Sequence, residues 1–398
     1  MLLPLLSLLL LLPCSIIAAP TNTHTLDNPW GEYAPECLAD KPSLWDESRI
    51  IKKWYTINLD AEAHDMWREV ANDYKDKMMS TLDVVKTMAD EFGGEGTWDM
   101  LMPLFSDVPD KLTEPYKTEI KAMADLTGIP VEQLTLLNLF YEVNKACTSL
   151  IAMDHNGKTY HGRNLDFGLF FLWDTEKHTW GLTWGLRDLV VQLDFQKGGK
   201  QLFKAVTFAG HLGVITAVRP GAYSISTNTR FGKAPDAITN FFMNGLIGDQ
   251  QFLMYAYRDM LTKYATFEEA RDYIENVHLL VMGYATMGHV DGGIVITRSA
   301  NQTDHTEVID TSKPNGWYVL QTNYDWNEDD IYLDYRTIPG NKCMQQMGRN
   351  RLTKENLFQV MSSQTTLNKE TVYTTIIEIE SGEIYTFLQE CKDPCWFV

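Results

Sequence analysis

The cysteines are the residues of this chain whose number and spacing first suggest chemistry. Cys14 lies in a predicted signal peptide, so its removal leaves an odd number of thiols. In an oxidising compartment the odd thiol is an intermolecular link or a reactive group. Cys391 and Cys395 can close a small terminal loop, and Cys37 and Cys343 could then pair over a long span. Cys147 would remain, either as a buried inert thiol or as a reactive one.

Cys147 stands where a predicted helix gives way to a predicted strand. The residues after it predict a strand, an Asn156-Gly157 turn and a returning strand through Arg163. A two-residue turn places Cys147 opposite Asp166. A guanidinium stabilises a nearby thiolate, and a carboxylate can orient a nearby amine. Because residues three apart on a strand face opposite sides, Arg163 and Asp166 both reach Cys147 only if the strand bends near Asn164.

The common metal-binding and nucleophile motifs do not occur. The sequence has no His-Glu-x-x-His, no paired Cys-x-x-Cys, no Gly-x-Ser-x-Gly, no phosphate-binding Gly-x-x-x-x-Gly-Lys, and no papain-like Cys-Gly-x-Cys-Trp around Cys147. The nine histidines are scattered. The sequence therefore predicts no metal site and no cofactor.

The charge balance is strongly acidic. The chain has 398 residues, in which 34 Lys and Arg stand against 53 Asp and Glu, for a formal net charge of −19. Nucleic-acid binding, which rests on Lys and Arg, is not expected. Since carboxylates protonate in acid and their mutual repulsion falls, the composition suits work at acidic pH, although a soluble acidic protein of any compartment has a similar balance.

Residues 1–19 predict a secretory signal peptide. They carry no charged side chain and contain an apolar run from Leu8 to Leu12, followed by the small residues Ala18 and Ala19. Cleavage is expected near Ala18–Pro20. No later stretch approaches the roughly 18 apolar residues of a membrane span, so the mature chain is predicted to be soluble and to have passed through the secretory pathway.

Hydrophobic periodicity predicts helices in the first third of the chain. One helix begins near Asp60, a second is N-capped by Thr113 and closed by Gly128, and a third runs from Pro130 to Val143. The first carries an apolar stripe at helical spacing: Trp67, Val70, Tyr74, Met78, Leu82, Val85, Ala89 and Phe92.

Strand patterns dominate after Ala146 and predict an α+β fold with mainly antiparallel strands. A helical stretch from about Asp236 to Val277 interrupts them. Besides the hairpin that follows Cys147, the predicted strands are Leu189–Phe195, Lys204–Phe208, Ile294–Thr297, Trp317–Gln321, Val372–Glu380 and Glu383–Leu388.

Two segments around Cys147 resemble a known family. Asn144-Lys-Ala-Cys147-Thr-Ser and His161-Gly-Arg-Asn-Leu-Asp-Phe-Gly168 are similar to acid ceramidases and N-acylethanolamine acid amidases, in the choloylglycine-hydrolase-like branch of the N-terminal nucleophile hydrolases. The resemblance covers nearly the whole mature chain. It implies an αββα sandwich of antiparallel sheets with a helical N-terminal subunit. Its other segments are Phe203-Lys-Ala, Phe208-Ala-Gly210, Trp317-Tyr-Val-Leu-Gln-Thr-Asn-Tyr-Asp325, Leu333-Asp-Tyr-Arg336 and Cys391-Lys-Asp-Pro-Cys395.

The resemblance implies that the precursor cuts its own Ala146–Cys147 bond. The products would be an α chain of about residues 20–146 and a β chain of residues 147–398, joined by a disulfide into a heterodimer. The freed α-amine has a pKa near 8 and can activate the thiol on the same residue.

The resemblance also assigns roles to individual residues. Cys147 would attack the amide carbonyl, Arg163 and Asp166 would orient it and tune its charge, Asn323 would donate to the oxyanion, and Arg336 would belong to the polar network. The implied disulfides are Cys37–Cys343 and Cys391–Cys395.

The chain departs from the family pattern at two positions. In Ser226-Thr-Asn-Thr-Arg230 the family has a Glu where this chain has Thr229, beside Asn228 and the expected oxyanion. We expect the Thr229 hydroxyl to form a hydrogen bond near the nucleophile instead. Ala146 replaces a bulkier aliphatic residue before the cut. Separately, Asn301-Gln-Thr303 is the only glycosylation sequon and lies in a predicted hairpin loop.

The function that the resemblance implies is lysosomal hydrolysis of the N-acyl bond of ceramide to sphingosine and a fatty acid. The alternatives are an N-acylethanolamine amidase and an inactive secreted lipid-binding homologue. Ceramide is nearly insoluble, so an anionic lysosomal membrane surface and a sphingolipid activator protein are the partners to consider. The apolar segment Phe167–Trp173 either lies in the core or lines the route of the acyl chain.

Overall fold

The computed structural model describes residues 36–143, 146–167, 173–230, 241, 249–331, 334–393 and 395. The predicted signal peptide lies outside this range. So do residues 144–145 before the expected cut, residues 168–172 of the apolar segment, Leu333, and much of the first part of the predicted helical stretch.

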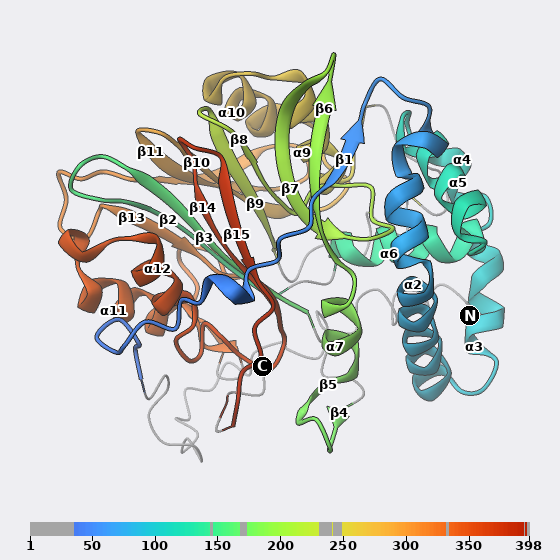
Figure 1. Ribbon diagram of the computed structural model, residues 1–398, viewed down its shortest axis with the longest axis horizontal. Helices are drawn as coiled ribbons and strands as arrows, with labels where there is room; N and C mark the ends of the chain where they lie inside the picture. Colours follow the sequence, from blue (N-terminus) through green and yellow to red (C-terminus); the bar gives the residue numbers. More distant parts are fainter. Residues whose placement is uncertain are drawn as a thin grey trace.

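Two mainly antiparallel sheets pack face to face at the centre of the molecule (Figure 1). Within the described residues, the larger sheet has eight strands in the order β1-β6-β7-β8-β9-β10-β11-β12, and the smaller has five in the order β13-β2-β3-β14-β15. The larger sheet comprises β1 (Tyr55–Asn58), β6 (Val190–Lys197), β7 (Lys200–Phe208), β8 (Thr216–Arg219), β9 (Tyr223–Thr229), β10 (Gly283–His289), β11 (Gly292–Arg298) and β12 (Thr303–Val308). The smaller comprises β2 (Ala146–Met153), β3 (Thr159–Asp166), β13 (Tyr318–Gln321), β14 (Thr371–Glu378) and β15 (Glu383–Phe387), and β4 (Trp173–Asp174) pairs separately with β5 (Thr179–Trp180).

Helices cover the outer faces of both sheets. α11 (Thr337–Met347) and α12 (Lys354–Met361) pack on the smaller sheet, and α9 (Leu253–Lys263), beside α10 (Phe267–Asn276), packs on the larger one. The resulting helix–sheet–sheet–helix order confirms the predicted αββα fold class. The remaining helices are α2 (Ala63–Gly93), α3 (Thr97–Leu101), α4 (Val108–Lys111), α5 (Tyr116–Thr127), α6 (Val131–Val143) and α7 (Gly181–Arg187), with short 3₁₀ segments at Glu47–Arg49, Met102–Phe105 and Arg349–Arg351.

The N-terminal helices follow the sequence pattern closely. α2 buries most of the predicted stripe that the structure describes, with Trp67, Met78 and Val85 each at most 3% exposed. Gly128 closes α5 in the left-handed conformation (φ 73°), as predicted. The predicted Thr113 cap is wrong, because α5 begins at Tyr116 and the Glu114 carboxylate accepts from the Thr118 amide in place of a capping hydroxyl.

The segment before Cys147 is built into the rest of the fold. β1 extends the larger sheet by pairing in parallel with β6, although residues 20–58 show little periodicity in the sequence. Arg258 of α9 forms a buried ion pair with Glu119 of α5, and the Glu142 carboxylate of α6 accepts from the first amides of α9. Disulfides join Cys37 to Cys343 and Cys391 to Cys395.

The register of the β2–β3 hairpin differs from the predicted one by one residue. The loop has three residues, because Asp154 pairs with Lys158 while its carboxylate accepts from the amides of Asn156 and Lys158. Gly157 adopts a positive φ of 88° that this loop requires. Consequently Cys147 lies opposite Leu165, and Asp166 lies opposite Ala146.

Candidate active site

The register places Cys147 and Arg163 on the same face of the smaller sheet. Arg163 lies two residues from Leu165, the partner of Cys147, and directly opposite Ser149. Its Nη2 donates to the Cys147 sulfur at 2.8 Å, and both side chains are fully buried. Arg163 needs no bend near Asn164 to reach the sulfur, and Asp166 lies on the other face, so the two side chains do not both reach the thiol.

Arg163 is a buried cation without a carboxylate partner among the described residues. Its other hydrogen bonds go from Nη1 to the Ser149 hydroxyl (3.1 Å) and the Asn228 side-chain oxygen (2.9 Å). Burial raises the pKa of the nearby Tyr373 phenol to about 12, so that group stays neutral. An uncompensated buried charge costs several kcal/mol. A Cys147 thiolate is therefore the anion best placed to neutralise Arg163.

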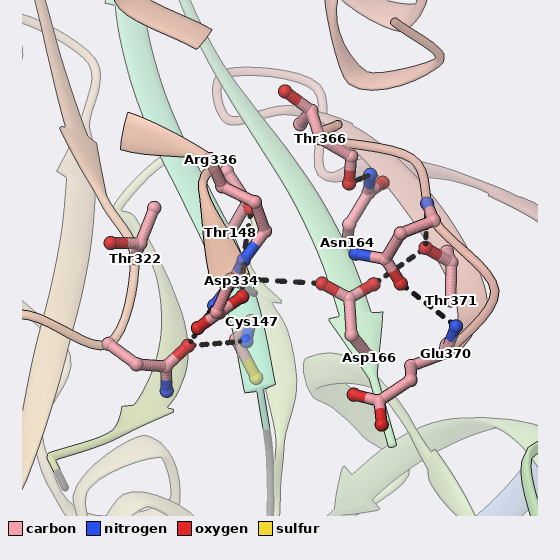
Figure 2. A network of polar contacts seen from close by, with 12 residues as sticks. Cys147, Thr148, Asn164, Asp166, Thr322, Asp334, Arg336, Thr366, Glu370 and Thr371 are labelled. Carbon is pink, nitrogen blue, oxygen red and sulfur yellow. Dashed lines mark hydrogen bonds and ion pairs between the residues drawn. The ribbon is translucent and has the colours of Figure 1, made fainter. Parts of the chain in front are cut away.

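Asp166 faces the opposite side of the sheet from the Cys147 sulfur. There it accepts a hydrogen bond from the Thr371 hydroxyl (2.7 Å) and lies 3.4 Å from Arg336 Nη1 (Figure 2). Burial raises the pKa of Asp166 to about 6, although the Arg336 charge opposes the shift. Arg336 itself is held by Asp334, which accepts from Nε at 2.6 Å and from Nη2 at 2.7 Å.

Asn323 connects Arg336 to the backbone of Cys147. Its side-chain oxygen accepts from the Cys147 amide and from Arg336 Nη2, both at 2.7 Å. Its nitrogen donates to the Thr229 carbonyl at 2.7 Å. Since the chain is continuous through Ala146 and Cys147 in β2, this geometry belongs to the uncut protein. Here the side chain predicted to be the oxyanion donor accepts a hydrogen bond from the nitrogen of the Ala146–Cys147 peptide.

Asn228 and Thr229 lie beside this group at the end of β9. The Asn228 side-chain nitrogen donates to the Cys147 carbonyl at 3.0 Å and also lies near the Gln321 and Thr322 carbonyls. The Thr229 hydroxyl is buried and has no hydrogen-bond partner within the described residues. The expectation that this hydroxyl binds near the nucleophile is therefore wrong, and the Thr229 carbonyl makes the local contact.

The structure thus brings the predicted catalytic residues, with Asn228 and Thr229, into one polar cluster around Cys147. Ser149 and His161 lie in the segments that resemble the family but had no predicted role, and Asp334 and Thr371 were not predicted to join the cluster. Ser149 and His161 could have been found from the two-residue period of strands, because each lies two positions from Cys147 or Arg163 on its own strand. Asp334 lies two residues before its partner Arg336 inside the motif Leu333-Asp-Tyr-Arg336, so the motif contained it. Thr371 carries no such signal, since it approaches Asp166 through tertiary packing.

Other predicted features lie away from the cluster. Asn301 is exposed in the loop between β11 and β12. Phe167 is buried, whereas Trp173 is 39% exposed. In the part of the chain that the structure describes, no group of His, Cys, Asp or Glu has the arrangement of a metal site, and no helix is long and apolar enough to cross a membrane.

Known proteins resemble this chain over its whole length. Residues 53–112 match the family described as the beta subunit of N-acylethanolamine-hydrolyzing acid amidase, and residues 147–328 match the linear amide C-N hydrolases of the choloylglycine hydrolase family. A probable acid ceramidase of Caenorhabditis elegans is 34% identical over 98% of both chains. Acid ceramidase of Homo sapiens is 33% identical over 86% of this chain and 87% of its own. The solved structure of a Caenorhabditis elegans N-acylethanolamine-hydrolyzing acid amidase ortholog is 26% identical, with a TM-score of 0.50, and covers 61% of this chain and 100% of that one.

Proposed function

The chain belongs to the family of acid ceramidases and N-acylethanolamine acid amidases, which are amide hydrolases, and we propose that it cleaves the N-acyl bond of ceramide. The acid ceramidase relatives, which align over most of both chains, support this substrate. The observation that carries the mechanism is the buried Arg163 guanidinium, whose Nη2 lies 2.8 Å from the Cys147 sulfur.

The proposed reaction proceeds through a thioester. The Cys147 thiolate attacks the amide carbonyl, and the C–N bond breaks as the leaving sphingosine nitrogen takes a proton from the α-ammonium of Cys147. The α-amine then takes a proton from water as the water adds to the thioester, which releases the fatty acid and regenerates the thiolate and the α-ammonium. Arg163 stabilises the thiolate before attack and again after acyl release.

The site residues on the other face of the sheet serve the α-amine. Once the Ala146–Cys147 bond is cut, the former amide nitrogen becomes that amine, with Asn323 Oδ1 already at 2.7 Å and Arg336 behind it. Asp166, opposite Ala146 in the register, helps to hold the amine. The Asn323 nitrogen would leave the Thr229 carbonyl to donate to the oxyanion, an interaction worth about 3–4 kcal/mol.

The same thiol would perform the activating cut. Attack of Cys147 on the Ala146 carbonyl transfers the acyl group from nitrogen to sulfur, and water releases the two chains, residues 20–146 and 147–398. The match to the choloylglycine hydrolase family, which begins at Cys147, supports this boundary. β1, α5 and α6 pack against the catalytic part, so the proposed heterodimer has non-covalent contacts besides the Cys37–Cys343 disulfide.

N-terminal sequencing of the purified protein tests the cut. The larger product should begin at Cys147, should separate from the smaller one on a denaturing gel only after reduction, and should not form in Cys147→Ala. A Cys147→Ala chain that still splits at this bond would refute the mechanism.

Hydrolysis of N-acylethanolamines is the second candidate function. The matched family of residues 53–112 and the solved relative, both named for N-acylethanolamine-hydrolyzing acid amidase, favour it. The two functions are separated by measuring kcat/KM for ceramide and for an N-acylethanolamine of the same acyl chain at acidic pH. A higher value for ceramide is expected, and a higher value for the N-acylethanolamine would reverse the assignment. If the processed protein hydrolyses neither substrate, the remaining alternative is an inactive lipid-binding homologue.

We further propose that the enzyme works in the lysosome after removal of residues 1–19 and glycosylation at Asn301. Its substrate would be presented at an anionic membrane surface, with a sphingolipid activator protein as a candidate partner. Co-localisation of the tagged chain with a lysosomal marker, and a glycosidase-sensitive mobility that Asn301→Gln abolishes, are the expected results.

A further inference from the structure

A chain of buried hydrogen bonds crosses the space between the two sheets and ends at Arg163. His161 Nε2 contacts the Ser226 hydroxyl at 2.8 Å, Ser226 donates to the Ser149 hydroxyl at 2.8 Å, and Ser149 donates to Asn228 Oδ1 at 2.6 Å. All of these side chains are fully buried. None of His161, Ser149 and Ser226 takes part in the proposed reaction.

Asn228 Oδ1 can only accept, so Ser149 must donate to it and Ser226 must donate to Ser149, which gives this series of hydrogen bonds one direction. Burial, together with the Arg163 charge, lowers the pKa of His161 to about 3, so the ring is neutral and has one donor and one acceptor. The Ser226 hydroxyl has one proton and donates it to Ser149, so it must accept a hydrogen bond from His161 Nε2. The other ring nitrogen, Nδ1, then accepts from the Ser224 hydroxyl at 2.8 Å.

This direction decides how Arg163 is held. Ser149 directs its proton to Asn228 Oδ1, so a lone pair of its own oxygen faces Arg163 Nη1 at 3.1 Å. Nη1 thus donates to two neutral oxygens, and the series of hydrogen bonds from His161 sets the orientation of both. A carboxylate would normally hold a guanidinium in place, but none pairs with Arg163 among the described residues. These neutral hydrogen bonds therefore fix the angle at which Arg163 Nη2 approaches the Cys147 sulfur.

We propose that Ser149, Ser226 and His161 are positioning residues that hold Arg163 against Cys147. This inference rests on the proposed role of Cys147 as nucleophile. The three side chains come from both sheets, so the reactive thiol is aligned by the packing of one sheet on the other. Loss of any link lets Nη1 turn away and weakens the Nη2 contact with the sulfur.

Alkylation of Cys147 by iodoacetamide measures this contact directly, because only the thiolate reacts. The rate is followed from pH 4 to pH 9 in processed wild-type protein, Ser149→Ala and Ser226→Ala. Each variant is expected to raise the midpoint of the pH profile by about one unit, so that the alkylation rate below the midpoint falls about tenfold. The other titratable and charged groups around the thiol are Tyr373 and His161, the Cys147 α-amine of the processed protein, and Asp166, Asp334 and Arg336 on the opposite face of the sheet. All of them are present in wild type and in both variants, so a difference in midpoint reports the lost hydroxyl.

Thr286→Val is the matched control. Thr286 lies directly opposite Ser226 on β10, and its buried hydroxyl has no hydrogen-bond partner within the described residues. The control should keep the wild-type midpoint. If Ser149→Ala fails to fold, Ser226→Ala, which acts one link further from Arg163, still decides the question.

The outcomes separate this proposal from the proposed function. Wild-type midpoints in folded Ser149→Ala and Ser226→Ala, with Arg163→Met shifted, would overturn the positioning role and leave the nucleophile intact. A wild-type midpoint in Arg163→Met would refute the Arg163–thiolate pair itself. A shift in Thr286→Val equal to that in Ser226→Ala would assign the effect to packing and also overturn the proposal.

Discussion

Asp166 should make the protein more stable in acid than at neutral pH. Burial raises its pKa from 3.8 to about 6. Below about pH 4 the carboxyl is protonated in both the folded and the unfolded chain. Between pH 4 and pH 6 only the folded chain keeps the proton, so the free energy of unfolding falls as the pH rises. Above about pH 6 the group is ionised in both states and the loss is complete, at about 3 kcal/mol for roughly two pKa units.

Asp166→Asn tests this reasoning, because an amide resembles the protonated carboxyl and does not titrate. The background is Cys147→Ala, which keeps the chain uncut and the unfolding transition simple. Urea titrations at pH 4, 5, 6 and 7 give the free energy of unfolding at each pH. Between pH 4 and pH 7 the background should lose about 2–3 kcal/mol of unfolding free energy through Asp166, and Asp166→Asn should not show this loss.

Asp304→Asn is a control of opposite sign. Burial opposes the shift, but hydrogen bonds from Ser299 and Arg230 lower the pKa of Asp304 to about 2. The ionised Asp304 carboxylate adds to the free energy of unfolding above pH 3.8, and this addition is lost as the pH falls toward 2. It is therefore nearly constant between pH 4 and pH 7. Asp304→Asn should therefore lower stability equally at all four pH values. An Asp166→Asn curve parallel to that of its background would show that Asp166 is not the titrating group.

Three further predictions concern a residue of the site, a buried ion pair between helices and an exposed aromatic side chain. Thr229→Val should leave the melting temperature unchanged or higher, because the hydroxyl that it removes is buried with no hydrogen-bond partner among the described residues. A loss of more than about 1 kcal/mol in the free energy of unfolding would show that the hydroxyl does have a partner. Glu119→Gln should cost about 3–5 kcal/mol in urea unfolding by leaving Arg258 buried without its ion pair, and adding Arg258→Met should recover most of it; an undiminished loss in the double variant would contradict this. Trp173→Ser should reduce hydrolysis of ceramide in anionic liposomes more than that of a soluble short-chain amide, with less than about 1 kcal/mol of destabilisation, because its side chain is 39% exposed; equal losses on both substrates would mean that Trp173 acts through stability.

The sequence by itself determined the fold class and most of the residues that meet around Cys147. The α2 stripe has a clear period because one face of the helix is buried, and strand segments with β-branched and aromatic residues were found for the same reason. β9 and β10 were missed because they are buried along their length and alternate in no visible way, although the motif around Asn228 lies on β9. The cysteine count singled out Cys147, and the roles of its neighbours came from the resemblance to a family. Such a resemblance identifies residue types and their order in the chain, and it needs no knowledge of how they are arranged in space.

Only the tertiary structure decided which side chains meet. The three-residue loop after Asp154 shifted the hairpin by one position, and because side chains alternate along a strand, that shift put Arg163 on the Cys147 face and Asp166 on the other. The contacts of Arg163 with Asn228, and of Asn323 with Cys147, join residues far apart in the chain. Such contacts depend on how one sheet packs on the other, and a local sequence pattern carries no information about that packing.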